Sequence, residues 1–314
     1  MLRVIARGGL GIENGDMNDR SHLLTEQRLA ESMGLDRMSI REALPLMNTQ
    51  DRVAVEAVGR ERENIAQATE LVVAAFRGGG RLIYVGAGTS GRLGVLDASE
   101  CPPTFRADPA MVQGIIAGGE QAMFRSQEGA EDDPEKGGAD VEARHVGAMD
   151  VVMGIATGGT TPYVHGALRR ARELGAKTVF LSCVQAFAGE PQVDVVIRPL
   201  TGPEVLTGST RLKAGTATKL VLNAITTIAM VQIGKVYENL MVDMQASNTK
   251  LVDRAGRIVR MATGVGRQEA FRVLEEAGGH VKLAILMVKK GVGAEEGRRV
   301  LEECGGRLRE AMGA

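Results

Sequence analysis

Short apolar runs alternate with amphipathic stretches through the middle of the chain. Each run has four to six residues, the length of a buried parallel strand. Stretches between the runs, such as residues 162–174, carry apolar positions at helical spacing. This alternation predicts a doubly wound parallel sheet of the α/β class. The expected strands are Leu82–Val85, Gly114–Ala117, Val151–Ala156, Thr178–Ser182 and Val195–Pro199.

Helical patterns flank the alternating region on both sides. Residues 23–50 predict one short helix, and residues 51–77 predict a long one that a run of three glycines terminates. Residues 216–242 are rich in Ala, Leu, Ile, Met and Thr and predict a buried helix. Residues 256–314 predict a small separate unit. Its three expected helices are Glu269–Glu276, His280–Lys289 and Ala294–Cys304.

These patterns divide the chain into three parts. Residues 1–60 form an N-terminal tail with helices, and residues 1–22 are Gly- and Asn-rich and expected to be loose. Residues 61–235 form the sheet domain. Residues 236–314 form a C-terminal helical region.

Composition narrows the classes of function. A chain of 314 residues with 44% hydrophobic and 25% charged residues is typical of a globular protein with a buried core. The net charge of −1 and the lack of basic runs with interleaved aromatics argue against a nucleic-acid partner. No stretch approaches the ~20 apolar residues of a membrane span. The first fifteen residues lack the long apolar core of a signal peptide, so we expect a cytoplasmic protein.

The cysteines and histidines do not form a recognisable site. Cys101, Cys183 and Cys304 lie far apart and lack paired spacing, which argues against a disulfide framework or a zinc site. The histidines are scattered, and we expect ordinary core or surface positions for them and no metal. They are His22, His145, His165 and His280.

Two of the expected strands end in similar polar loops. Residues 86–91 read Gly-Ala-Gly-Thr-Ser-Gly, and residues 157–161 read Thr-Gly-Gly-Thr-Thr. Glycines let the backbone approach an anion, and the helix that follows offers free N–H groups and the positive end of its dipole. We therefore predict a phosphate site that hydroxyl groups complete. Its candidate residues are Gly88, Thr89, Ser90, Thr157, Thr160 and Thr161.

The first loop also matches a rival pattern. Gly86, Gly88 and Gly91 spell the G-x-G-x-x-G fingerprint of dinucleotide sites, and Glu120 stands where a ribose-binding acid is expected. The hydroxyl pair, the cationic Arg92 and the repeated hydroxyl chemistry of the second loop favour one compact phosphosugar instead. A tight turn that binds nothing is the other alternative.

A third polar segment spans residues 202–216. It places Glu204, Ser209, Arg211 and Lys213 in a Gly-rich turn before a helix. Cations and hydroxyls at a helix start suit a phosphate or a carboxylate. The alternative is a plain polar helix cap.

Two acids lie near the first loop. Glu100 precedes a double proline, which we expect to end the helix and to hold Glu100 close to the phosphate loop. Glu131 lies in the acidic run at residues 128–133. Spacing alone selects neither residue over an ordinary solvated acid.

Several long strings of residues resemble the N-acetylmuramic acid 6-phosphate etherases, over roughly residues 24 to 310. These strings are Leu82–Phe105, Glu128–Asp132, Gly202–Thr216 and Asn239–Asp243. The resemblance implies a sugar isomerase (SIS) domain, a UBA-like C-terminal unit of three helices, and a homodimer with its site near the subunit interface. It also implies cleavage of the D-lactyl ether of N-acetylmuramic acid 6-phosphate to N-acetylglucosamine 6-phosphate and D-lactate.

The two active-site glutamates of that family fall on Glu100 and Glu131. In this chemistry the sugar ring opens, a base removes the C2 proton, an acid protonates the ether oxygen at C3, and water then adds to the unsaturated aldehyde. Two carboxyl groups supply acid and base if their surroundings separate their pKa values, and no metal or redox cofactor is needed. We expect Glu100 to protonate the leaving oxygen and Glu131 to be the second acid/base.

The chain departs from the family at three places. The second loop, residues 158–162, reads Gly-Gly-Thr-Thr-Pro where the family often has Ser-Gly-Arg-Thr-Pro. Val184 and Gln185 replace an Asn-Pro pair, and Arg106 stands where glycine is common. These changes predict altered substrate affinity or side-chain preference.

Two other functions fit the same resemblance. A sugar-phosphate isomerase on this fold needs a base but no acid for a leaving group. The glucokinase regulatory protein resembles these etherases and binds a sugar phosphate without converting it. That protein carries duplicated SIS domains, whereas this chain has room for one.

Overall fold

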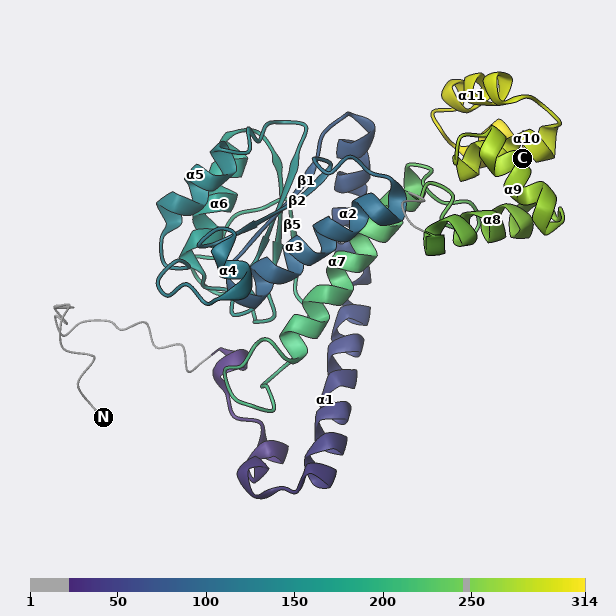
Figure 1. Ribbon diagram of the computed structural model, residues 1–314. Helices are drawn as coiled ribbons and strands as arrows, with labels where there is room; N and C mark the ends of the chain where they lie inside the picture. The colour runs from purple at the N-terminus through teal and green to yellow at the C-terminus, as the bar shows by residue number, and fades with distance from the viewer. Residues whose placement is uncertain (1–22, 245–248, 314) are drawn as a thin grey trace.

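The computed structural model describes residues 23–244 and 249–313; the expected loose tail, with His22, lies outside them. A five-stranded parallel sheet lies at the centre, with helices on both faces (Figure 1). The strand order β2-β1-β3-β4-β5 confirms the predicted doubly wound α/β fold. The strands are β1 (Leu82–Gly86), β2 (Val112–Ile116), β3 (Val151–Ile155), β4 (Lys177–Leu181) and β5 (Val195–Ile197).

Different helices cover the two faces of the sheet. Successive strand residues point to opposite faces, so Ile83 and Val85 pack in one core while Leu82 and Tyr84 pack in the other. The first core is closed by α5 (Pro134–Glu142) and α6 (Pro162–Glu173). The second is closed by α2 (Arg62–Arg77), α3 (Gly88–Phe105) and α7 (Lys213–Gln232), and the short α4 (Gln121–Phe124) follows β2.

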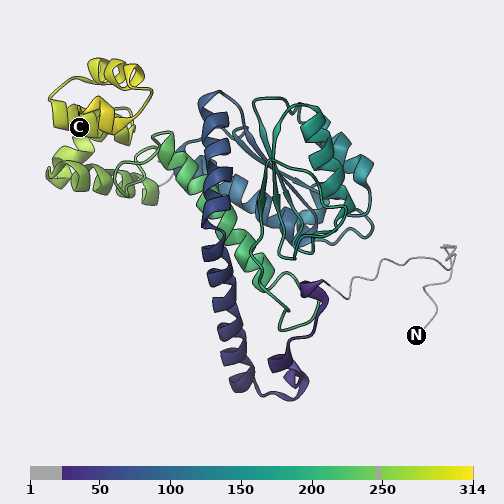
Figure 2. The same cartoon turned by 180° about the vertical axis from the view of Figure 1, so that it is seen from behind.

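Helix α1 (Ile40–Arg60) lies beside α7 and extends well beyond the sheet (Figures 1 and 2). It begins at a capping box in which the backbone N–H of Ser39 donates to Glu42 at 2.8 Å. Three short 3₁₀ turns precede it. They are Leu24–Glu26, Ala30–Ser32 and Leu35–Arg37.

The predicted boundary at residue 50 between a short and a long helix is wrong. The break between α1 and α2 falls at Glu61, whose carboxylate accepts hydrogen bonds from the backbone N–H of Arg198 at 2.9 Å and from Asn64 at 2.7 Å. The apolar stripe runs across the break without interruption. A contact with a residue far along the chain therefore sets the boundary.

The double proline does not end α3 as we expected. The helix continues through Pro102 and Pro103 to Phe105, and Arg106 then adopts a left-handed conformation with φ of 48°. Each proline removes a helical hydrogen bond at a cost of roughly 3 kcal/mol. Cys101 and Phe105 are buried on either side of the prolines, and their packing against the sheet outweighs the missing bonds.

Helix α7 is the one helix of the described residues long and apolar enough to cross a membrane, and 56% of its apolar window is buried. Val221, Leu222 and Ile225 are fully buried in the core beside the sheet, so it is a core helix. It ends at Gln232 rather than at residue 242, because Gly234 turns the chain with φ of 85°.

The C-terminal helices have a hydrophobic core of their own. The three expected helices correspond to α9 (Arg267–Glu276), α10 (Val281–Lys290) and α11 (Ala294–Glu303), with α8 (Thr249–Thr263) before them and α12 (Leu308–Ala311) after. The ammonium of Lys282 donates to Asp243 at 2.7 Å and to the carbonyls of Gly234 and Gly306. The division at residues 60/61 and 235/236 stays a proposal.

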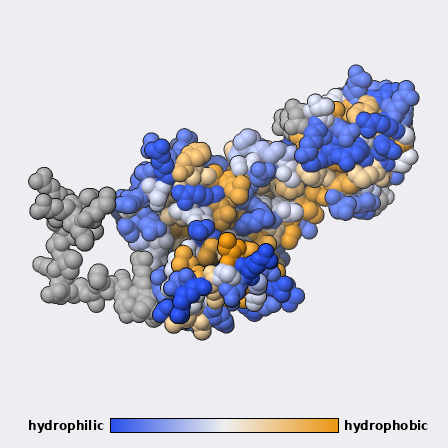
Figure 3. All heavy atoms as spheres, turned by 60° about the horizontal axis from the view of Figure 1, so that its bottom comes forward, coloured by the Kyte–Doolittle hydropathy of each residue, from blue (hydrophilic) through white to orange (hydrophobic). Residues whose placement is uncertain are grey.

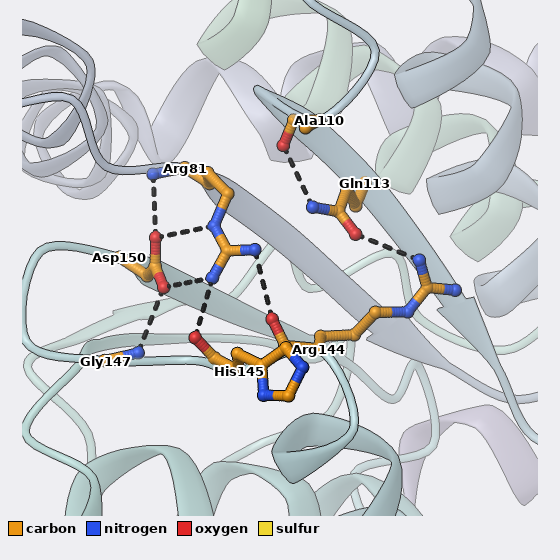
Figure 4. A network of polar contacts seen from close by, with 7 residues as sticks. All are labelled: Arg81, Ala110, Gln113, Arg144, His145, Gly147 and Asp150. Carbon is orange, nitrogen blue, oxygen red and sulfur yellow. Dashed lines mark hydrogen bonds and ion pairs between the residues drawn. The ribbon is translucent and has the colours of Figure 1, made fainter.

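An ion pair between Arg81 and Asp150, which precede β1 and β3, fastens the amino-terminal edge of the sheet (Figure 4). The Arg81 backbone N–H and Nε donate to Oδ1 of Asp150 at 2.9 and 3.0 Å, and Nη2 donates to Oδ2 at 2.7 Å. The guanidinium also donates to the carbonyls of Arg144 and His145, and the Gly147 N–H donates to Asp150. The network holds the starts of β1 and β3 level with each other.

We expect Arg81→Met to lower the free energy of unfolding by about 2–4 kcal/mol, because it leaves the buried carboxylate of Asp150 without its charged partner. Burial raises the pKa of Asp150, but the hydrogen bonds and charge of Arg81 outweigh burial and hold that pKa below its usual value. The stabilisation is therefore complete above about pH 4, the ordinary aspartate pKa of an unfolded chain, and is lost as the pH falls below it.

Urea unfolding of the wild type and the variant at pH 7 and pH 3 measures this difference, which we expect to shrink at the lower pH. The matched control is Arg169→Met, which breaks the exposed pair with Glu135 and should cost less than about 1 kcal/mol. A loss at pH 7 no larger than that of the control contradicts the role of Arg81.

Candidate active site

The carboxyl ends of β1 and β3 form the point at which the strand order reverses. The chain leaves β1 for β2 on one side and reaches β3 on the other side. Gly86 pairs with Ile155, so the two polar loops leave the sheet at the same level. Ligands of doubly wound sheets bind in the crevice at such a point. The sheet therefore brings the two predicted phosphate loops together.

The first loop passes directly into α3 through very close backbone contacts. A Cβ on Gly86 would lie 2.7 Å from the backbone nitrogen of Gly91, and one on Gly91 would lie 2.6 Å from the side chain of Ile116. Gly88 has φ of 52°, in the left-handed region that favours glycine. No side chain caps α3, so its first N–H groups are open to an anion. Ser90 is buried within this turn.

The second loop is held from several sides. The Cys183 N–H donates to the Thr157 carbonyl at 2.9 Å, and Nε2 of His165 lies 2.7 Å from the Gly159 carbonyl oxygen. Gly159 has φ of 82°, and a Cβ there would lie 2.7 Å from the side chain of Val184. His165, for which we expected an ordinary core or surface position, therefore holds this loop in place. The sign of this role in the sequence was its position a few residues after the loop.

Thr160 and Thr161 are half-buried at the start of α6. The Thr161 carbonyl accepts hydrogen bonds from Val164 and His165, as the first turn of a helix requires. The hydroxyl groups of this loop therefore lie beside a second helix start at the same edge of the sheet.

The third polar segment lies against the first loop. A Cβ on Gly215, in the first turn of α7, would lie 3.6 Å from the methyl carbon of Thr89. Ser209 is half-buried and Arg211 is exposed. The structure thus adds the start of α7 to the crevice between β1 and β3.

Two residues of this segment already have partners inside the protein. Glu204 is fully buried and accepts the N–H groups of Lys213 and Ala214, both at 3.0 Å, at the start of α7. Burial raises the pKa of Glu204 despite these bonds. Burial also lowers the pKa of Lys213, whose ammonium donates to Gln50 at 2.6 Å. Both side chains shape the helix start, and their contact with substrate stays a prediction.

Glu131 lines a cavity of about 300 Å³ that reaches the first loop. The cavity is lined by Gly88, Arg92, Ser126 and Glu131, among others. The Glu131 carbonyl accepts the Tyr163 N–H at 3.0 Å, which ties this segment to α6. Arg92 donates to the carbonyls of α4 at 2.6 and 3.0 Å and so is engaged within the wall of the cavity. One predicted glutamate therefore shares a cavity with the phosphate loop.

Glu100 lies at the other end of α3. It follows Gly88 by twelve residues, which at 1.5 Å per residue is about 18 Å along the helix axis. Its side chain is exposed. The expectation that Glu100 lies close to the phosphate loop is therefore wrong within one chain, and its catalytic role stays a prediction.

Metal-binding groups do not gather in the part of the chain that the structure describes. Within residues 23–244 and 249–313 no three His, Cys, Asp or Glu side chains lie as they would around a metal ion. Cys101, Cys183 and Cys304 are unpaired.

Comparison with known proteins gives consistent matches. The family model for the glucokinase regulatory protein N-terminal SIS domain matches residues 64–172. The chain is 54% identical over 272 residues to an N-acetylmuramic acid 6-phosphate etherase of Crocosphaera subtropica, covering 87% of this chain and 89% of that protein. It is 56% identical to that of Gloeobacter violaceus, covering 86% and 88%.

A solved structure of c3406 from E. coli CFT073 aligns with 64% of this chain and 97% of its own, at 14% identity and a TM-score of 0.45. The sequence matches are far closer and span both the sheet and the C-terminal helices. The SIS architecture, the loops at the strand-order reversal and this degree of identity lead to one conclusion: the chain belongs to the N-acetylmuramic acid 6-phosphate etherase family.

Proposed function

We propose that this protein cleaves the D-lactyl ether of N-acetylmuramic acid 6-phosphate to N-acetylglucosamine 6-phosphate and D-lactate. One observation carries the proposal: an acid, Glu131, shares a cavity with an uncapped helix start in a chain 54% identical to a named etherase. An anion site beside an acid is the combination that a phosphosugar lyase needs.

The phosphate would bind at the first loop. The open N–H groups of α3 and its positive dipole end favour an anion, and the hydroxyls of Thr89 and Ser90 add donors. The second loop supplies Thr157, Thr160 and Thr161 from the neighbouring strand. Because His165 and close packing fix that loop, its groups are positioned before the substrate arrives.

The reaction needs one base and one acid. In the open-chain sugar the aldehyde acidifies the C2 proton, and a carboxylate removes it. The electron pair forms a C2–C3 double bond as the C3–O bond breaks, and the second carboxyl protonates the departing lactyl oxygen. Water then adds its oxygen to C3 and a proton returns to C2, which regenerates both glutamates. We assign Glu131 and Glu100 to these roles, with Glu100 as the acid at the leaving oxygen.

The proposed reaction also bears on the cellular location of the protein and on its need for a cofactor. The substrate is a charged sugar phosphate that does not cross a membrane unaided, so we propose a cytoplasmic location. The groups named above account for every proton transfer of the elimination, so the proposal includes no cofactor.

A second candidate is regulatory binding of a sugar phosphate without conversion. The match of residues 64–172 to the glucokinase regulatory protein domain favours it. The two candidates differ in one measurable product, because only an etherase releases lactate.

We expect the purified protein to release D-lactate from N-acetylmuramic acid 6-phosphate. In H₂¹⁸O the label should enter C3 of the amino sugar and not the lactate, since elimination breaks the C3–O bond and water refills that carbon. In D₂O the product should carry deuterium at C2. Coupled lactate assay and mass spectrometry measure these outcomes. Binding without lactate release supports the regulatory role, and ¹⁸O in lactate contradicts elimination.

We expect Ser90→Ala to raise KM for the 6-phosphate sugar by about 10- to 150-fold, the value of one hydrogen bond to a charged phosphate, roughly 1.5–3 kcal/mol. The kcat should change little, because the bond is present in both ground state and transition state. Steady-state kinetics with and without the 6-phosphate measures this effect.

The matched control for Ser90→Ala is Ser32→Ala, which removes a serine hydroxyl bonded to Leu29 in a 3₁₀ turn. We expect wild-type kinetics from this control. Equal impairment of phosphorylated and unphosphorylated sugars by Ser90→Ala means that the loop does not bind phosphate.

We further propose that the protein is a homodimer whose interface includes α1 and α7. Four exposed apolar side chains lie on one side of α1 at spacings of four, three and eight residues; they are Ile40, Leu44, Met47 and Val55. An apolar groove of about 770 Å³ lies where the end of α1 meets α2 and α7. Figure 3 brings the lower end of Figure 1 towards the viewer and shows hydrophobic residues gathered near the middle of that face. Exposed apolar side chains and an apolar groove on the same pair of helices are typical of an interface.

We expect the double variant Val55→Glu with Ile228→Glu to sediment as a monomer where the wild type sediments as a dimer. Each substitution places a charge on this face, and two-fold symmetry doubles the effect. The control is Met149→Glu, an equally exposed apolar position at the amino-terminal edge of the sheet. A dimer that survives the double variant places the interface elsewhere.

A further inference from the structure

A second cavity lies where the end of α3 meets the C-terminal helices, and we call it the junction cavity. Its volume is about 290 Å³, near the lower end of the range for small-molecule sites. Its wall combines Arg106, directly after α3, with Asp243 and with His280 and Arg298 of the C-terminal helices. These helices lie to one side of the sheet domain (Figure 1). A molecule in the junction cavity would therefore contact both parts of the chain.

Three basic side chains of the wall lie close to one another. Nη1 of Arg106 lies 3.0 Å from Nδ1 of His280. Burial, followed by the charges of Arg106 and Arg298, lowers the pKa of His280, so the imidazole is neutral near pH 7. Its Nδ1 then accepts the hydrogen bond from Arg106, and its proton lies on Nε2. Within the described part of the chain no acceptor binds that Nε2–H, so the ring retains one donor.

The protein does not balance the charges of the two arginines. The acid Asp243 binds the ammonium of Lys282 at 2.7 Å, so its charge is already matched. In the part of the chain that the structure describes, neither Arg106 nor Arg298 forms an ion pair, and Glu302 on the same wall pairs with neither of them. Two guanidinium groups beside one neutral ring repel each other, and an anion beside both would remove this repulsion.

The start of α10 adds backbone donors to the same wall. Val281, Lys282 and Leu283 line the cavity, and no side chain caps this helix. The first N–H groups of a helix have no partner within it, and the positive end of the helix dipole favours an anion. These donors supplement the charge that the two arginines provide.

The donors of the wall are better suited to a phosphoryl group than to a carboxylate. Guanidinium groups bind phosphate oxygens in pairs, and the imidazole and the helix start supply further donors from other directions. We propose that the junction cavity is a second anion site, which binds inorganic phosphate or a small phosphate ester and thereby joins α3 to the C-terminal helices. It is distinct from the phosphate loops, because those lie at the opposite end of α3. The site does not depend on the proposed reaction.

NMR of the histidine rings tests this site separately from the phosphate loops. The chain has four histidines, so labelling with ¹³C-histidine gives few signals, and His280→Asn identifies the signal of His280. We expect inorganic phosphate at constant ionic strength to shift the His280 signal to saturation, whereas chloride should not. His165, which holds the second phosphate loop, reports on binding at the loops in the same spectra.

Arg298→Gln should weaken the phosphate affinity measured at His280 by about 10- to 150-fold, the value of one hydrogen bond to a charged group. Arg106→Gln should weaken it by a similar factor from the side of the sheet domain. The matched control is Arg299→Gln, the next position of α11, which pairs with Glu303 and does not line the cavity. We expect the affinity of the wild type from this control.

Comparison of three probes identifies the ligand. Tighter binding of N-acetylglucosamine 6-phosphate at His280 supports a phosphate ester, and tighter binding of inorganic phosphate supports the free anion. D-lactate that binds as tightly as either phosphate overturns the assignment to a phosphoryl group. The absence of a saturable shift, or an equal loss in Arg298→Gln and Arg299→Gln, overturns the site. None of these outcomes depends on whether the wild type releases lactate.

Discussion

The site depends on the parallel pairing of β1 with β3. These strands are adjacent in the sheet but far apart in the chain, and the ion pair between Arg81 and the buried Asp150 joins them at their amino-terminal edge. Once the starts of the strands are level, their carboxyl ends are level too. Two loops that are seventy residues apart along the chain then open into the same crevice. The chemistry at one edge of the sheet thus rests on an ion pair at the opposite edge.

Helix α3 links the two ends of the proposed active site. Its first turn leaves N–H groups open where we propose that the phosphate binds, and its last turns present Glu100 on the outer surface. The contacts of Asp97 with β1 and α7 keep these features at a fixed separation. A rigid helix that carries both features cannot bring them to one small substrate. In the proposed homodimer, Glu100 of one chain can instead approach the phosphate loop of the other.

The sequence determined the features that depend on neighbours along the chain. Periodicity placed all five strands within two residues of their observed ends, and glycines and hydroxyls identified the loops at their carboxyl ends. It also placed the three helices α9 to α11. These elements follow from apolar spacing and turn residues, which act over a few positions. Long strings shared with the etherases added the two glutamates, which spacing did not select.

Only the tertiary structure decided the features that depend on contacts distant in sequence. The break between α1 and α2 falls at Glu61 because that carboxylate binds the backbone of Arg198. Helix α3 continues through its prolines because Phe105 is buried against the sheet. Glu204 was a candidate substrate-binding residue because it lies in a polar, Gly-rich segment, but its buried carboxylate caps the start of α7. The length of α3 placed Glu100 far from the phosphate loop. A local pattern contains no information about which distant residue will pack against it, and that packing settled each of these cases.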